Sequence, residues 1–246
     1  MAKIIWHDTL DSTNAEALRR IGTLENRSVL AAVRQTAGRG QRGNRWLSAP
    51  GENLTFSLVL KHAPDALPVR DAFRLNLVAS VAVRDFLRDE GCEALVKWPN
   101  DLYVRQRKIC GILVENGLGS AGFSHSVIGI GININQRVFG DLANATSLFC
   151  ETGRALELKP ALEKVVSCLE GRLQALWNAD AYALLREDYM ASLFQAKRPA
   201  PYRDLLTGKL FTGILEDVGE DGRAVVTDCG DGSRKRFAFK ELGYIL

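Results

Sequence analysis

One loop-like segment restricts the folds open to this chain more than any other feature. Residues 36–48 read TAGRGQRGNRWLS, in which glycine and arginine each occur three times. Glycine loses much conformational freedom when a segment becomes ordered, and neighbouring guanidinium groups repel one another unless an anion lies between them. The segment therefore favours neither a helix nor a strand. We interpret it as an anion-binding loop; a solvated surface loop with incidental glycines is the alternative.

The surroundings of this loop exclude a dinucleotide-binding fold. Residues 38–43, GRGQRG, match the pattern G-x-G-x-x-G, in which a helix must begin at the third glycine to hold a pyrophosphate. Here Pro50 and Gly51 follow closely and prevent such a helix. The sequence therefore argues against a Rossmann fold.

Apolar periodicity predicts an α+β arrangement around the loop. In residues 53–60, every second side chain is large and apolar, which is typical of a strand with one face in a core. The residues that should share this face are Leu54, Phe56, Leu58 and Leu60. The other β-rich segments are 3–7, 28–34, 94–104, 108–115 and 125–135.

Three segments have the spacing of helices. One helix should begin at about Ser12, because Thr13 and Glu16 stand at the capping-box distance. A longer helix is predicted over residues 68–91, which open with proline and end with glycine. Helical periodicity returns over residues 160–194.

The last part of the chain is expected to form a small β unit. Its short alternating strands are separated by turn pairs that end in glycine. These pairs are Thr207-Gly208, Asp221-Gly222 and Asp231-Gly232. We therefore predict two domains: residues 1–196 with a mixed β-sheet flanked by helices, and residues 197–246 as a small β-barrel.

Composition excludes several classes of function. The 246 residues include five widely separated cysteines, three scattered histidines and a net charge of +3. Cysteines without a C-x-x-C pair predict reduced thiols rather than disulfides or a zinc site. So small a charge does not predict nucleic-acid binding, and no apolar run is long enough to span a membrane. We expect a cytoplasmic protein with no nucleic-acid or membrane partner.

Two further segments contain residues suited to chemistry. Residues 97–101, KWPND, predict a tight corner between strands, and Lys108 then enters an apolar strand beside Gly111, which favours a charge at the floor of a pocket. Taken alone, Lys97 or Lys108 is typical of a surface residue, and Asp101 of a turn. Residues 127–133, VIGIGIN, would leave one strand face without side chains; a β-bulge is the alternative.

Together, these motifs resemble those of biotin protein ligases. The motifs, in the family's order, are Asp11 to Asn14, Gln35 to Trp46, Lys97 to Asp101, Lys108 with Gly111 to Glu115, Gly129 to Asn133, and Asn144 to Leu148. The resemblance implies a class II synthetase-like catalytic domain with a C-terminal SH3-like barrel. It also implies that biotin and MgATP form biotinyl-5′-AMP. Biotin then passes to a lysine of the biotin carboxyl carrier protein of acetyl-CoA carboxylase or a related biotin-dependent carboxylase.

The resemblance also implies roles for individual residues. The expected biotin contacts are Ser12, Thr13, Asn14, Gln35, Gly38, Arg39, Gly40, Trp46, Lys108, Gly111 and Gly129. The expected ATP contacts are Arg42, Trp46, Asn100, Lys108 and Asn133. Lys108, Arg39 and Asp101 are the expected catalytic residues, with Asp101 as the Mg²⁺ ligand. The carrier lysine attacks the adenylate, so no covalent nucleophile is expected from this protein.

The chain departs from the family pattern in two places. Gln41 stands where many members have a third loop arginine, so the resemblance does not extend to retention of the adenylate by that side chain. Many bacterial relatives also carry an N-terminal winged helix-turn-helix, whereas the motifs begin here at residue 11. We expect no repressor activity, and a monomer or weak homodimer.

Two other functions fit parts of the pattern. A lipoate-attaching ligase shares the fold and the adenylate chemistry, but Ser12 and Gln35 suit a ureido ring better than a dithiolane, which has no N–H group. A module that only stores biotin has no use for Lys108 and Asp101.

Overall fold

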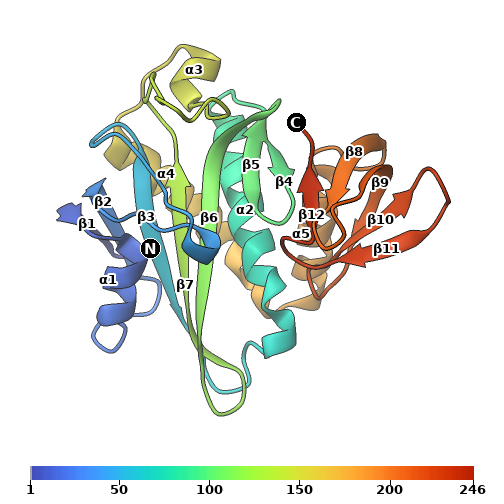
Figure 1. Ribbon diagram of the computed structural model, residues 1–246. Helices are drawn as coiled ribbons and strands as arrows, with labels where there is room; N and C mark the ends of the chain where they lie inside the picture. Colours follow the sequence, from blue (N-terminus) through green and yellow to red (C-terminus); the bar gives the residue numbers. More distant parts are fainter. Residues whose placement is uncertain (1) are drawn as a thin grey trace.

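The computed structural model describes residues 2–246, except for the side chain of Arg42. Its larger sheet has seven strands in the order β1-β2-β3-β7-β6-β5-β4 (Figure 1). The strands are β1 (Ile4–Leu10), β2 (Val29–Gln35), β3 (Leu54–Lys61), β4 (Leu95–Lys97), β5 (Asp101–Val104), β6 (Arg107–Leu118) and β7 (Phe123–Ile132). β1 and β2 are parallel and the other neighbours antiparallel, so the sheet is mixed, as predicted.

Helices cover both faces of this sheet. α1 (Thr13–Arg19) packs against β2, β3 and β7, whereas α2 (Phe73–Asp89) contacts β4, β5 and β6 from the other face. α4 (Leu158–Arg172) and α5 (Ala179–Ala191) pack on α2 and lie behind the sheet in Figure 1. A short helix, α3 (Leu148–Thr152), lies at one end. Within residues 2–246, no helix is both long and apolar enough to cross a membrane.

The two faces of β3 pack against different layers of the fold. The predicted shared face is confirmed, because Leu54, Phe56, Leu58 and Leu60 all belong to the main core. The opposite face carries Val59, which joins a smaller cluster under α1. Burial of each such aliphatic or aromatic side chain contributes roughly 1.5–3 kcal/mol, so both faces hold the strand in register.

The predicted start of the first helix at about Ser12 is confirmed, but its cap and the start of the second helix differ from the sequence predictions. The cap of α1 is Ser12, whose Oγ accepts a hydrogen bond from the Ala15 N–H at 3.4 Å, so the predicted capping box on Thr13 is wrong. The Glu16 carboxylate instead binds Arg19 one turn later. The helix predicted from residue 68 begins at Phe73, after a 3₁₀ turn over residues 69–71.

The loop over residues 36–48 confirms the exclusion of a Rossmann fold. Its single helical turn is a 3₁₀ turn, Gln41–Gly43, and the chain then runs to β3 without an α-helix. Gly38 is needed for this shape, because a Cβ there would lie 2.4 Å from the Trp46 carbonyl oxygen. The loop therefore folds back on itself and brings the Trp46 side chain over the sheet.

The C-terminal part forms a second, antiparallel sheet in the order β11-β10-β9-β8-β12. Its strands are β8 (Pro199–Asp204), β9 (Leu210–Val218), β10 (Ala224–Asp228), β11 (Arg234–Phe237) and β12 (Leu242–Tyr244). The predicted turns are confirmed, because Gly208, Gly222 and Gly232 have φ of 77°, 79° and 70°. Apolar residues of both sheets belong to one core, which gives no separate core for each part. The division into two domains at 196/197 therefore stays a proposal.

Candidate active site

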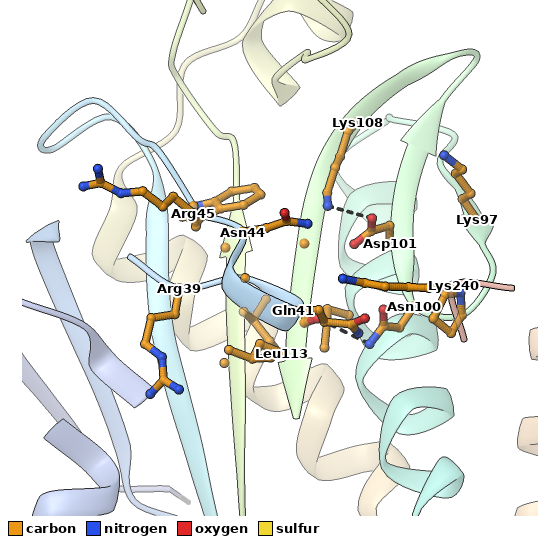
Figure 2. Close-up of a pocket in the computed structure, with 18 of the residues that line it drawn as sticks. Arg39, Gln41, Asn44, Arg45, Lys97, Asn100, Asp101, Lys108, Leu113 and Lys240 are labelled. Carbon is orange, nitrogen blue, oxygen red and sulfur yellow. Dashed lines mark hydrogen bonds and ion pairs between the residues drawn. The ribbon is translucent and has the colours of Figure 1, made fainter. Parts of the chain in front are cut away.

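A cavity of about 660 Å³ lies between the large sheet, the 36–48 loop and the C-terminal sheet (Figure 2). This volume falls in the usual range of small-molecule sites, roughly 300–1,000 Å³. Twelve of the predicted site residues line it: Ser12, Thr13, Asn14, Gln35, Arg39, Gly40, Trp46, Asn100, Asp101, Lys108, Gly111 and Gly129. Gly38 and Asn133 do not, and the side chain of Arg42 lies outside the described part.

The floor of the cavity is a patch of sheet without side chains. Gly111 on β6 pairs with Gly131 on β7, and Gly129 lies two residues before Gly131 on the same face. A Cβ on Gly129 would lie 2.2 Å from Asn14 Oδ1, and one on Gly131 would lie 2.3 Å from Trp46 Cε2. The bare face is therefore confirmed. The β-bulge alternative is wrong, because the register is continuous through both glycines.

One end of the cavity is polar but uncharged. This polar end consists of Ser12, Thr13, Asn14 and Gln35. The Thr13 N–H donates to Gln35 Oε1 at 2.7 Å, and Asn14 Nδ2 donates to Glu115 Oε2 at 2.9 Å. Such mutual bonding fixes each side chain in one orientation, which suits recognition of a neutral polar group.

Ser57 and Glu115 hold the polar end together from outside it. Ser57 Oγ lies 2.8 Å from Thr13 Oγ1 and 2.5 Å from Asn14 Oδ1. Glu115 binds the Arg39 guanidinium at 2.9 Å. Sequence reasoning missed both roles. The signal for Ser57 was present, since it is a polar residue on the face opposite the apolar stripe of β3.

The other end of the cavity is cationic. This cationic end consists of Lys97, Lys108, Lys240 and the carboxylate of Asp101. Lys108 Nζ lies 2.7 Å from Asp101 Oδ2, and both side chains are about one third exposed, at 31%. The Lys108 ammonium also lies 5.8 Å from the Trp46 ring centre. It is therefore accessible to a ligand in the cavity, as the sequence predicted.

The backbone of Lys108 is fixed by the segment 144–148. The Lys108 N–H donates to the Asn144 carbonyl at 2.7 Å, and the Thr146 N–H donates to the Lys108 carbonyl at 2.9 Å. Asn133 Nδ2 in turn donates to the Thr146 carbonyl at 2.8 Å. Asn133 thus supports the segment that positions Lys108, and its predicted contact with ATP stays a prediction.

The KWPND corner places Asn100 and Asp101 at the cationic end. Asn100 is buried, and its Nδ2 donates to Asn76 Oδ1 at 2.6 Å and to the Ile112 carbonyl at 3.3 Å. These bonds tie the corner to α2 and β6. The predicted tight corner between β4 and β5 is therefore confirmed, and the nucleotide contact of Asn100 stays a prediction.

Lys97 was not among the predicted site residues, yet it lines the cavity. Its Nζ lies 4.6 Å from the Tyr103 ring centre and 5.1 Å from that of Tyr244. Burial lowers the pKa of Lys97, because the surroundings solvate its charged form less well than water does. The interpretation of this lysine as an ordinary surface residue is wrong.

The arginines of the loop lie differently from the lysines. Figure 2 shows the guanidinium groups of Arg39 and Arg45 directed away from Lys108. The catalytic role predicted for Arg39 stays a prediction. Gln41, the departure from the family pattern, lines the cavity together with Asn44.

A metal bound by protein groups alone has no support in the described part. Residues 2–246 contain no group of three or more histidine, cysteine or acidic side chains that could hold an ion. Among the described residues that line the cavity, Asp101 is the one carboxylate. Any metal here needs further ligands from a bound anion or water.

Sequence comparison identifies a family for this chain. The profile of the Biotin/lipoate A/B protein ligase family matches residues 6–133. The chain is 30% identical to a biotin–[acetyl-CoA-carboxylase] ligase of Paracoccus denitrificans, over 88% of this chain and 90% of that one. It is 42% identical to the bifunctional ligase/repressor BirA of Escherichia coli, over 52% of this chain but only 39% of that protein.

Structural comparison extends the similarity to both sheets. A biotin protein ligase from Aquifex aeolicus, solved in complex with biotin and ATP, superposes with a TM-score of 0.81. It has 26% sequence identity, and the match covers 99% of each chain. This chain belongs to the biotin/lipoate A/B protein ligase family, and within it to the biotin protein ligases.

Proposed function

We propose that this protein is an ATP-dependent ligase that activates biotin as biotinyl-5′-AMP and transfers it to a lysine of a biotin carboxyl carrier protein. One observation carries the proposal: a single cavity joins an uncharged polar end to a cationic end across a floor of glycines. The polar end suits the ureido ring of biotin. The cationic end suits the triphosphate of ATP.

Charge explains why the two ends must share one cavity. A carboxylate and a phosphate oxygen ~4 Å apart repel by ~4 kcal/mol at an effective dielectric constant near 20. Lys108 lies where it can offset this repulsion, beside the floor on which the two substrates meet. Because its ammonium is held before the substrates arrive, it also stabilises the charge that develops during transfer.

The two steps balance without a protein nucleophile. A carboxylate oxygen of biotin attacks the α-phosphorus of ATP, and pyrophosphate leaves. The deprotonated amine of the carrier lysine then attacks the acyl carbon, and AMP leaves. The protein orients the reactants, holds them together and excludes water from the mixed anhydride.

The donors present fit Mg²⁺ bound with the nucleotide. Mg²⁺ typically takes one or two protein carboxylates, with phosphate oxygens and water as its other ligands. Asp101 is suitably placed to be that carboxylate, and Mg²⁺ would neutralise phosphate charge when bound.

We also propose that the protein works in the cytoplasm as a monomer or weak homodimer. Within residues 2–246, all five cysteines are free, which fits a reducing compartment.

The transfer reaction tests the proposed function. Purified protein is incubated with biotin, MgATP and the apo carrier domain of acetyl-CoA carboxylase, and intact mass is measured. We expect one biotinyl group per carrier, and none on a carrier whose acceptor lysine is replaced by arginine. A parallel reaction with lipoate tests the other activity of the family. Lipoyl transfer without biotinyl transfer would contradict the proposal.

A further inference from the structure

Lys108 lies against a segment that has no regular structure of its own. Between the end of β7 at Ile132 and the start of α3 at Leu148, the chain forms neither a helix nor a strand. Within this segment, Ala145 pairs with Lys108 by an isolated β-bridge. A segment without a continuous hydrogen-bond ladder keeps its position through individual contacts. The contacts that anchor residues 133–147 therefore also affect where Lys108 lies.

Thr146 is fully buried in this segment, and its backbone and side chain are both bonded. Its N–H donates to the Lys108 carbonyl at 2.9 Å, and its carbonyl accepts from Asn133 Nδ2 at 2.8 Å. Its hydroxyl donates to Oε1 of Glu151, which lies on α3. The carboxylate of Glu151 is thus connected to the backbone of Lys108 through one residue.

The same oxygen of Glu151 also binds the strand that carries Lys108. Arg107, the residue before Lys108 on β6, donates from Nη2 to Glu151 Oε1 at 2.7 Å. The Glu151 side chain is only 10% exposed, so water competes little for these bonds. Hydrogen bonds to an ionised group are stronger than neutral ones. Glu151 therefore ties the start of β6 and the segment 133–147 to α3, which lies at one end of the large sheet (Figure 1).

The helix that carries Glu151 is itself fixed. Ser147 caps α3, because its Oγ accepts a hydrogen bond from the Cys150 N–H at 3.1 Å. The same hydroxyl donates to the Gln136 carbonyl at 2.6 Å. Glu151 does not line the cavity. Any effect of this carboxylate on the reaction must therefore pass through the residues that it holds.

We propose that Glu151 is a positioning residue for Lys108: by binding Arg107 and Thr146 together, it holds the backbone of Lys108 where the ammonium meets the reacting carboxylate and phosphate. This inference rests on the proposed function. Displacement of a catalytic group by about 1 Å can lower a rate about 10²-fold, so an anchor outside the cavity can still affect the rate. The polar end is held by other residues, so biotin affinity should not depend on Glu151.

Glu151→Ala tests this role, and Glu163→Ala, at an exposed position of α4, is the matched control. The maximal rate and the KM values of biotin-dependent ATP–pyrophosphate exchange are measured. Biotin affinity is measured by calorimetry, and folding by thermal unfolding. Glu151→Ala is also combined with Lys108→Ala. Because a positioning residue acts through the group that it positions, the effects of these two substitutions should not add.

We expect Glu151→Ala to lower the maximal exchange rate by about tenfold, the loss typical of a hydrogen bond to a charged group, with biotin affinity unchanged. In Lys108→Ala, the added substitution should lower the remaining rate by less than about twofold. The inference is overturned if Glu151→Ala keeps its rate within about twofold, if its biotin affinity falls by the same factor as its rate, if the loss is equal with and without Lys108, or if Glu163→Ala has the same effect.

Thr146→Val keeps the inference testable if Glu151→Ala does not fold. It removes the hydroxyl that binds Glu151 and nearly preserves the shape of the side chain. We expect the same pattern: a lower exchange rate, unchanged biotin affinity, and little further loss in Lys108→Ala. Full addition of the two losses would contradict the inference.

The outcomes also separate this inference from the proposed function. If the unsubstituted protein shows no biotin-dependent exchange, the proposed function fails and the role of Glu151 fails with it. If it shows exchange and the variants at Glu151 and Thr146 keep its rate, only the role of Glu151 is wrong.

Discussion

The two ends of the cavity differ in how their polar groups are satisfied. At the polar end, Thr13 is hydrogen-bonded to Gln35, and Ser57 binds both Thr13 and Asn14. Asn14 also binds Glu115, so these side chains are ordered without a ligand. At the cationic end, three lysines face one carboxylate, and the charge is balanced only by a ligand. The comparison teaches that one end selects by shape and hydrogen bonding, and the other by charge.

Replacing Lys108 should have the largest effect on catalysis. It should impair the function of the cationic end and leave biotin binding at the polar end intact. We expect Lys108→Ala to lower the rate of ATP–pyrophosphate exchange by about 10²–10³-fold, the loss typical of one preorganised donor at a transition state. Biotin affinity, measured by calorimetry, should change little. Lys159→Ala, on the exposed surface of α4, is the control. Unchanged pyrophosphate release in Lys108→Ala would refute its assigned role.

A substitution in the floor should impair the polar end instead. Gly129→Ala would place a Cβ 2.2 Å from Asn14 Oδ1, so the Asn14 side chain must shift, which disturbs its hydrogen bonds with Ser57 and Glu115. We expect biotin affinity to fall by about tenfold or more, from the lost hydrogen bond and the altered shape. Gly171→Ala, where a Cβ meets nothing within 4 Å, is the control. Biotin binding at the affinity of the unsubstituted protein would show that this floor is not the biotin site.

Asp101→Asn tests whether the carboxylate at the cationic end binds Mg²⁺. The substitution keeps the shape of the side chain and removes the charge that pairs with Lys108 at 2.7 Å. We expect the exchange rate to fall by roughly tenfold, with a higher Mg²⁺ concentration needed for half-maximal rate, because Mg²⁺ prefers charged oxygen ligands. A Mg²⁺ requirement equal to that of the unsubstituted protein would exclude Asp101 as a ligand.

The smallest expected effect is a pH dependence from Lys97. Its pKa is lowered by burial, so it loses its charge at a lower pH than an exposed lysine does. Because a polyphosphate favours the protonated form, ATP affinity should fall a few-fold as pH rises through that pKa. Lys97→Arg keeps its charge at all these pH values and should remove this part of the fall. An identical pH profile for both proteins would exclude Lys97 from the nucleotide site.

The sequence predicted those parts of the site whose residue types are unusual for their local structure. Glycines in an apolar strand and a lysine at the start of another are unusual for those positions, whereas anion binding by the loop rich in glycine and arginine stays a prediction. The floor at Gly129 and the ammonium of Lys108 are therefore where the sequence led us to expect them.

The missed residues depend on contacts between distant parts of the chain. Lys240 resembles any surface lysine until Phe239 is seen to pack on Trp98. Lys97 lies against Tyr244, again on the C-terminal sheet, a contact that the sequence around Lys97 does not indicate. The cap of α1 shows that even a local feature can depend on distant residues, because Ser12 and Thr13 are both good helix caps. The Thr13 hydroxyl is hydrogen-bonded to Gln35 and Ser57, which leaves the Ser12 hydroxyl to cap the helix.

Biotin-dependent ATP–pyrophosphate exchange by the unsubstituted protein tests the central claim most directly, because it requires both ends of the cavity to act together. The account predicts rapid incorporation of labelled pyrophosphate into ATP when biotin is present, and none when it is left out. Binding of biotin without any such exchange would contradict it.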